Sequence, residues 1–187
     1  MKKTLKHLFI ILTLVLSFSL LNSSVDTYAA KKKVEYKTSV VTDNKTKKKA
    51  KQIVKKLIKK NMSEFEKAKV LHDWLVLNNY YDDKARDQIF NGTWKSSNPS
   101  YDAKGALIKG KAVCGGLTEA YKLLCEYAGL KCEYVRSSKL NHAWNEVKID
   151  GKWYIVDITF DVGTASSKAD VTKRKRQGLT PANYTNF

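Results

Sequence analysis

The fold is decided by a short stretch near the C-terminal end of the chain, residues 147–154, which read VKIDGKWY. An Asp-Gly pair between two strand-like runs is the strongest short sequence signal for a β-hairpin with a two-residue turn. Such a turn pairs Ile149 with Lys152, and the antiparallel register that follows makes His142 and Asp157 diagonal neighbours on one face. Diagonal neighbours lie about 7–8 Å apart at the backbone. We therefore expect an imidazole–carboxylate hydrogen bond, provided that no bulge interrupts the register.

A second stretch, residues 113–128, predicts a helix that begins at a cysteine and stops before a glycine. Cys114 lies on the same helical stripe as Leu117 and Tyr121, so its sulfur should point toward whatever the helix packs against. The positive end of the helix dipole favours a thiolate at this position. Gly115 and the glycine after it let a substrate approach the backbone and leave N–H groups free for an oxyanion. A small buried cysteine explains this stretch equally well.

The two stretches together indicate nucleophilic catalysis by a Cys-His-Asp triad. His142 would hold Cys114 as a thiolate, and Asp157 would fix the imidazole and stabilise its charge. Attack on an amide carbonyl would give a thioester, which either water or an amine then resolves, and the triad does not decide between the two. The backbone N–H of Cys114 is one expected oxyanion donor. Four residues are candidates for a second donor or for the cleft walls: Gly115, Tyr101, Trp94 and Trp144. Trp144 fits equally well as a residue that covers the sheet where the helix docks.

The rest of the pattern predicts helices first and strands afterwards. Apolar spacing predicts a lysine-rich helix over 46–60. Ser63 and Glu66 form a capping box that opens a second helix, with Phe65 in its buried stripe and His72 as a packing residue beside that stripe. Residues 80–105 show no clear period and predict a long loop, which in a compact domain is usually functional. Strands are expected over 132–136, 141–149 and 152–159.

Composition and charge exclude several classes of protein. Hydrophobic residues make up 43% of the 187 residues, which excludes wholesale disorder, collagen and coiled coils. The formal net charge is +17, and residues 31–60 alone hold thirteen Lys against one Glu and one Asp, or +11. Residues 173–176 add a second basic cluster in a predicted loop. Such clusters favour anionic cell-envelope polymers as partners, whereas the helix lysines lack the interleaved aromatic residues of a specific nucleic-acid site.

The N-terminal residues predict export. Three lysines precede an apolar run from Leu8 to Leu21, and small residues then precede a cleavage point near Ala29 or Ala30. This run of fourteen residues is short for a membrane span, which needs about 20. We therefore expect a signal peptide at 1–29, a basic arm and Lys-rich helix at 30–62, and a catalytic domain at 63–187. The mature protein should be secreted or associated with the cell wall, and not transmembrane.

Three motifs in this order resemble the transglutaminase-like superfamily of papain-like fold. The motifs are DAKGAL at 102–107 with VCGG at 113–116, NHAWNEV at 141–147, and GKWYIVDITFD at 151–161. VLHDWL at 70–75 followed by YD at 81–82 also resembles the helix that precedes the cysteine motif in bacterial members. The resemblance covers about residues 63–161. Leu117 stands where the family usually has Tyr or Phe.

The resemblance implies an α+β fold in which a catalytic-Cys helix packs on an antiparallel sheet, with Cys114, His142 and Asp157 as the triad. Family members include protein-crosslinking transglutaminases, cysteine proteases and peptide amidases. Our first expectation is hydrolysis of peptide or isopeptide bonds in envelope protein or wall peptide. Protein crosslinking by Gln-Lys amide exchange is the second, and a non-catalytic envelope-binding module is the third. No organic cofactor is required and no metal site is visible.

Two other cysteines lie on either side of the predicted end of the Cys114 helix. Cys125 and Cys132 are close enough in sequence to approach one another, and an extracellular setting permits a disulfide between them. Two buried free thiols fit the sequence equally well. The three cysteines and His142 do not have the spacing of zinc ligands.

Overall fold

The fold is described by a computed structural model for residues 34–37, 40, 42–163 and 165–177. The predicted signal peptide and seven residues of the basic arm (30–33, 38, 39 and 41) lie outside these residues. The elements, in chain order, are β1 (Val34–Lys37), α2 (Asn44–Leu57), α3 (Glu64–Asn78), β2 (Tyr80–Tyr81), α4 (Asp83–Phe90), η1 (Pro99–Tyr101), the π-helical turn η2 (Gly105–Lys109), β3 (Lys111–Ala112), α5 (Cys114–Tyr127), β4 (Cys132–Ser137), β5 (His142–Ile149), β6 (Lys152–Val156), α6 (Ile158–Val162) and α7 (Lys168–Gln177). None of the described helices combines the length and apolarity that crossing a membrane requires.

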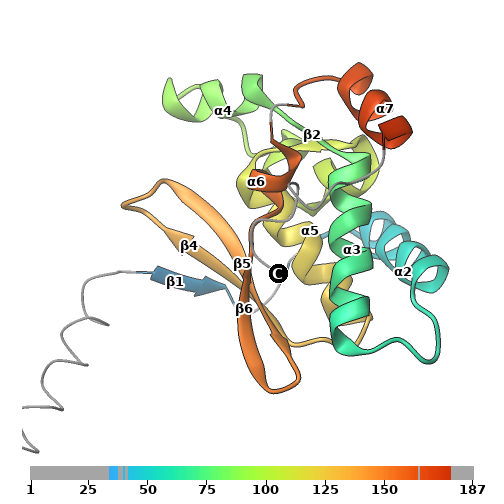
Figure 1. Cartoon of the computed structure of the whole chain (residues 1–187). Coiled ribbons are helices and arrows are strands. Elements are labelled where there is room, and N and C mark those ends of the chain that lie inside the picture. The colour runs from blue at the N-terminus through green and yellow to red at the C-terminus, as the bar shows by residue number, and fades with distance from the viewer. Residues whose placement is uncertain (1–33, 38–39, 41, 164, 178–187) are drawn as a thin grey trace, which may run out of the picture. The chain divides into compact units, whose positions relative to one another are not determined.

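Strands β4, β5 and β6 form an antiparallel meander in a four-stranded sheet of order β1-β4-β5-β6 (Figure 1). The hairpin between β5 and β6 has the predicted register, from Ile149 opposite Lys152 to Asn145 opposite Val156. Its turn residue Asp150 has φ 48° and the following glycine has φ 83°, as a tight hairpin turn with two positive φ angles requires. The Asp-Gly pair therefore fixes which residues face each other across the sheet.

The predicted strand over 152–159 is too long. Strand β6 ends at Val156, and the chain turns into α6 at Ile158. The reason is an N-cap: the side chain of Asp157 accepts hydrogen bonds from the N–H groups of Thr159 and Phe160. Aspartate is among the preferred N-cap residues, and here that local preference overrides continuation of the strand. Consequently the β5–β6 ladder ends at the pair Asn145–Val156, and His142 and Asp157 are not the diagonal cross-strand neighbours that the sequence predicts.

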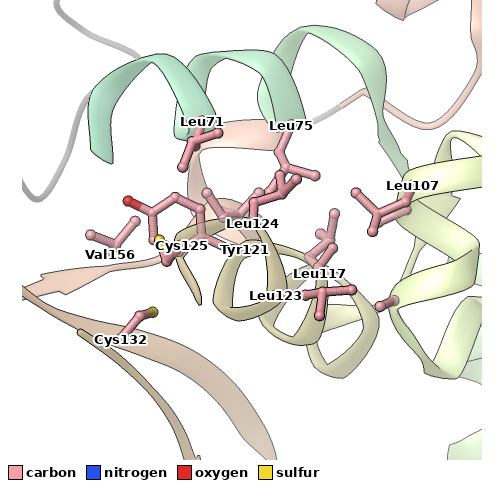
Figure 2. Close-up of a cluster of buried hydrophobic side chains, with 14 of the residues drawn as sticks. Leu71, Leu75, Leu107, Leu117, Tyr121, Leu123, Leu124, Cys125, Cys132 and Val156 are labelled. Atoms are coloured by element: carbon pink, nitrogen blue, oxygen red, sulfur yellow. The ribbon is translucent and has the colours of Figure 1, made fainter. Parts of the chain in front are cut away.

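Helix α5 contacts α2, α3 and strand β5 and lies at the centre of the hydrophobic core (Figure 1). Leu71 and Leu75 of α3 point onto Tyr121 and Leu124 of α5 (Figure 2). The Tyr121 hydroxyl donates to the carbonyl of Ala68 at 3.1 Å, which ties the two helices together inside the core. Burying α5 in this way holds its N-terminus, and hence Cys114, in a fixed place.

The first two predicted helices form, with different details. The lysine-rich helix α2 begins at Asn44 instead of residue 46, because Asp43 caps it, and ends at Leu57 instead of residue 60. Its apolar residues join the same core as α3 and α5. Helix α3 has the predicted capping box between Ser63 and Glu66. Phe65, however, is 43% exposed and does not belong to the buried stripe.

Residues 80–105, predicted to be a loop, contain a strand, a helix and a 3-10 turn. Strand β2 pairs in parallel with β3, and α4 and η1 follow β2. Asp82 organises this region: it caps α4 through the N–H of Ala85 and accepts hydrogen bonds from the Ser100 hydroxyl at 2.5 Å and the Lys111 ammonium at 2.9 Å. The segment is thus ordered by contacts with one buried carboxylate. Such contacts produce no hydrophobic periodicity in the sequence, so the order could not be predicted from it.

The second basic cluster, residues 173–176, was predicted to lie in a loop and belongs instead to helix α7. Arg174 of this helix is half-buried, and its guanidinium donates to the carbonyls of Val76, Asn79 and Val162. These carbonyls lie at or just after the ends of α3 and α6, where backbone oxygens lack helical partners. One of the four basic residues therefore has a structural role.

Gly116 lets the start of α5 approach the preceding loop. A Cβ atom at this position would lie 2.7 Å from the carbonyl oxygen of Ser100 and 2.8 Å from that of Asp102. Both are backbone atoms that cannot move aside. At the neighbouring Gly115, a Cβ would lie 3.3 Å from the Tyr134 hydroxyl, the end of a side chain, and 3.9 Å from the Tyr101 carbonyl oxygen, an ordinary contact distance.

We expect Gly116→Ala to destabilise the fold by about 1–3 kcal/mol, because the added methyl overpacks a rigid contact. Gly115→Ala, the matched control one residue away, should change stability little. Thermal unfolding followed by circular dichroism checks both variants. Equal melting temperatures for the two variants would contradict the role of Gly116.

Candidate active site

A cavity of about 350 Å³ opens at the N-terminus of α5. It is bounded by α4 and the segment after it, by the start of α5, and by β4 and β5. Its lining residues are Ile89, Trp94, Tyr101, Val113, Cys114, Gly115, Tyr134, Arg136, Asn141, His142 and Ala143. The predicted nucleophile and the predicted base therefore face the same cavity.

Cys114 is the first residue of α5 and is partly exposed in this cavity. Burial alone would raise the pKa of its thiol. A hydrogen bond with His142, the charge of that imidazole, and the backbone N–H groups of Ala143 and Gly115 outweigh burial and lower the pKa below its ordinary value. The surroundings of the sulfur thus favour the thiolate, which is the reactive form.

His142 is the first residue of β5 and lies between the cysteine and an aspartate. Its Nε2 is 2.7 Å from Oδ2 of Asp157, which leaves Nδ1 for the thiol. The hydrogen bonds with Asp157 and then with Cys114 outweigh burial and raise the pKa of the imidazole to about 10. The ring of Trp144 stacks on the imidazole, with centroids 6.1 Å apart. The environment therefore stabilises an imidazolium beside a thiolate.

Asp157 lies at the end of β6 and holds the imidazole from there. One carboxylate oxygen accepts from the N–H groups of Thr159 and Phe160 at the start of α6, at 3.0 and 3.2 Å, and the other contacts His142. The side chain is only 12% exposed. The carboxylate is thus fixed by the helix start, and its free oxygen is aimed at the ring. The three predicted triad residues come together in the structure, and their catalytic roles remain predictions.

Comparison with known proteins decides the family. Residues 51–158, more than half of the chain, match the family model of the transglutaminase-like superfamily. The chain belongs to the transglutaminase-like superfamily. This superfamily membership supports a thiol acyl-transfer enzyme in general.

Individual relatives are distant. The chain is 25% identical over 123 residues to kyphoscoliosis peptidase of Mus musculus and 24% identical over 115 residues to that of Homo sapiens. These matches cover 57% and 54% of this chain but only 18% and 16% of the relatives, so the chain spans less than a fifth of their length. The crystal structure of a TGase superposes with a TM-score of 0.54 at 18% identity, over 86% of this chain and 43% of that one. The predicted α+β, papain-like fold is confirmed.

Of the four other predicted site residues, three line the cavity and one, Trp144, does not. Gly115, Trp94 and Tyr101 line the cavity of this transglutaminase-like chain. The Tyr101 hydroxyl contacts the Ala85 carbonyl and the Gln88 side chain of α4, both at 3.1 Å, so it bonds to α4 and shapes the wall. Trp94 meets the Tyr101 ring edge-on at 5.9 Å. Trp144 does not line the cavity and instead stacks on His142.

Two tyrosines that were not among the predicted site residues lie beside Cys114. Tyr81 pairs with Ala112 in the short β2–β3 ladder, and its phenol contacts the backbone N–H of Cys114. Tyr134 of β4 lines the cavity next to Gly115. Burial, and then the charge of Cys114, raise the pKa of each phenol to about 12, so both keep their proton as potential donors. The YD motif at 81–82 marks Tyr81 as part of the family resemblance but not as a neighbour of Cys114, because parallel pairing of two-residue strands brings it to this place.

A buried ion-pair network supports α6 from below the site. His72 of α3, predicted to be a packing residue, is fully buried, and its ring nitrogens lie 2.9 Å from the Asp161 carboxylate and 3.1 Å from that of Asp73. Burial lowers the pKa of His72, but the hydrogen bonds and charges of both carboxylates outweigh it and raise the pKa overall. Asp161 lies in the same short helix whose N-cap is Asp157. The network therefore anchors the helix that carries the third triad residue.

The remaining cysteines are free thiols. Cys125 and Cys132 are both buried, and their side chains contact each other in the core (Figure 2). The sequence allowed either a disulfide or two free thiols here, and the structure has two free thiols. Across the described residues, no group of three His, Cys, Asp or Glu side chains is arranged to hold a metal ion.

The ion pair should set the pH dependence of Cys114 alkylation. Because His142 lowers the thiol pKa, the rate of reaction with iodoacetamide should reach its plateau below the ordinary thiol pKa of about 8.5. His142→Ala removes the group that offsets the effect of burial on the thiol pKa, so the inflection of the rate–pH curve should move above about pH 8.5. Alkylation rates followed by mass spectrometry across pH check this, with Cys114→Ser as the unlabelled control. The same inflection in both proteins would contradict the ion pair.

Asp161→Asn should destabilise the fold by about 3–5 kcal/mol, since it leaves His72 with a broken buried ion pair. The His72 pKa is raised in the fold, so the pair's stabilisation is complete below the unfolded value of about 6.5 and is lost as pH rises through the folded value. The loss in unfolding free energy should therefore shrink toward alkaline pH. Urea unfolding at several pH values measures it.

The matched control for this variant is Asp73→Asn, which removes the other carboxylate on His72 but keeps the link to α6. Only Asp161→Asn should also raise the inflection of Cys114 alkylation, because only that variant loosens the helix that holds Asp157. Identical behaviour of the two variants would contradict a positioning role for Asp161.

Proposed function

We propose that this chain is a secreted thiol enzyme that hydrolyses peptide or isopeptide bonds in cell-envelope protein or wall peptide. The observation that supports it most is the arrangement at the cavity: a lowered thiol pKa at Cys114, a raised imidazole pKa at His142, and Asp157 2.7 Å from the imidazole. Two of the relatives are named peptidases, which favours hydrolysis over transfer.

In the first half of the reaction, the Cys114 thiolate attacks the amide carbonyl and a carbon–sulfur bond forms. The carbonyl electrons move to oxygen, and the oxyanion takes the backbone N–H of Cys114. His142 then gives its proton to the leaving amine as the carbon–nitrogen bond breaks. Asp157 keeps the imidazole ring in place throughout, and the product is a thioester on Cys114.

In the second half, water attacks the thioester while neutral His142 takes its proton. The carbon–sulfur bond breaks, the carboxylic acid product leaves, and the thiolate–imidazolium pair is restored. A lysine amine in place of water would give amide exchange, which is the crosslinking alternative. Tyr81 is our candidate for the second oxyanion donor, because its protonated phenol lies beside the Cys114 N–H. In the free protein the phenol oxygen accepts that N–H, and the oxyanion would replace it as the acceptor.

Export and retention belong to the same proposal. The N-terminal signal-peptide pattern supports secretion. Helix α2 supports retention on anionic polymer. Its first turn has no acidic residue, and four of its lysines line one shallow surface hollow: Lys47, Lys48, Lys51 and Lys55. A polycationic face of this kind attracts polyanions without specific contacts.

The test uses the mature protein with peptides that offer a glutamine side chain, a backbone amide and an isopeptide bond. We expect hydrolysis, seen by mass spectrometry as a carboxylate in place of an amide, and a loss of at least about 10³-fold in Cys114→Ala. Cys125→Ala, which removes a buried thiol, should keep the activity. Incorporation of an added amine would favour crosslinking instead. Wall binding without turnover in the unmodified protein would overturn the enzyme proposal in favour of a binding module.

A further inference from the structure

The cavity contains one charged side chain that takes no part in the proposed reaction. Arg136 of β4 lines the cavity together with Cys114 and His142. In the sheet it is directly opposite Ala143, whose backbone N–H contacts the Cys114 sulfur. Directly opposite residues in an antiparallel pair have Cβ atoms about 4.5–5.5 Å apart and share one face of the sheet. Arg136 therefore extends from the backbone position that flanks the reactive sulfur.

The face that carries Arg136 is turned toward the catalytic helix. Ala143 is 3% exposed, and Asn145 two residues later donates to the carbonyl of Thr118 in α5 at 3.1 Å. Residues two apart on a strand point to the same side. Arg136 itself is exposed, so its guanidinium lies at the rim of the cavity where a bound substrate would pass.

Arg136 is the one permanently charged side chain in the described lining, beside the thiolate–imidazolium pair of Cys114 and His142. Among the described lining residues there is no Asp or Glu, and the other side chains apart from the reactive pair and Asn141 are aliphatic or aromatic. Within the described part of the chain, Arg136 makes no ion pair. Glu35 of β1 shares a neighbouring hollow with Arg136 but does not line this cavity. The guanidinium is thus available to a ligand in the cavity.

We propose that Arg136 binds a carboxylate of the acyl-donor substrate close to the reacting carbonyl, so that the site selects acidic peptides. The proposal rests on the proposed function and names the substrate class for it. A guanidinium presents paired N–H donors that match the two oxygens of a carboxylate. The aromatic walls offer contact to the rest of the peptide, and the positive rim attracts the charged group before it is bound.

The sharpest test compares two alkylating agents of Cys114 that differ by one charge. Iodoacetate carries a carboxylate and iodoacetamide carries a neutral amide at the same place. Arg136→Gln should lower the iodoacetate rate about two- to fivefold, as expected for loss of an exposed ion pair. The iodoacetamide rate should stay unchanged. Arg136→Lys, which keeps the charge, should retain most of the iodoacetate rate, and Arg176→Gln, an exposed arginine outside the cavity, should retain all of it.

The second measurement uses peptide pairs that differ only by Glu or Gln next to the scissile bond. The unmodified protein should prefer the Glu peptide in kcat/KM, Arg136→Gln should lose the preference, and Arg136→Glu should transfer it to a Lys peptide. An iodoacetate-to-iodoacetamide ratio that is the same in the unmodified protein and Arg136→Gln would overturn the carboxylate site. Retained alkylation selectivity without turnover of any peptide would instead reject the proposed function and leave the anion site standing.

Discussion

A single carboxylate joins the sheet, a helix and the reactive residues. Asp157 stops β6, caps α6 with one oxygen and holds His142 with the other at 2.7 Å. Two backbone N–H groups hold one oxygen of this carboxylate and fix its orientation, so the other oxygen points at the imidazole. The imidazole is thereby held with one nitrogen toward Asp157 and the other toward the thiol. The local preference that ends a strand thus also orders the site.

Each element that carries a reactive residue is anchored in the core. Helix α5 is buried by α2, α3 and the sheet, and the lack of a side chain at Gly116 lets its first turn pack on the loop before it. Helix α6, which is only five residues long, gains support from the buried contact of His72 with Asp161. Gly116, His72 and Asp161 do not line the cavity themselves, so these contacts leave the cavity walls available to substrate. The buried core therefore positions the sulfur, whereas substrate selection by the cavity rim is the role that we propose for Arg136.

The sequence allowed prediction of what depends on local chemistry. The hairpin register followed from Asp150 and the glycine after it, and the α3 start followed from its capping box, because both signals act over a few residues. The predicted end of β6 was wrong because the N-cap at Asp157 starts a helix where the strand pattern continues. Order within 80–105 was missed because Asp82 creates it through distant partners. The contact of His72 with Asp161 joins residues 89 positions apart, and no pattern in either segment announces it.

The central claim is that the imidazole of His142 is charged while the sulfur of Cys114 is ionised. The most direct measurement is a pH titration of the ring nitrogens of His142 by ¹⁵N NMR in the unmodified protein and in Cys114→Ala. The imidazolium should persist to a pKa near 10 in the unmodified protein, far above the ordinary histidine value of about 6.5, and should lose its proton at lower pH when the sulfur is absent. A ring that becomes neutral near pH 6.5 in the unmodified protein would contradict the account.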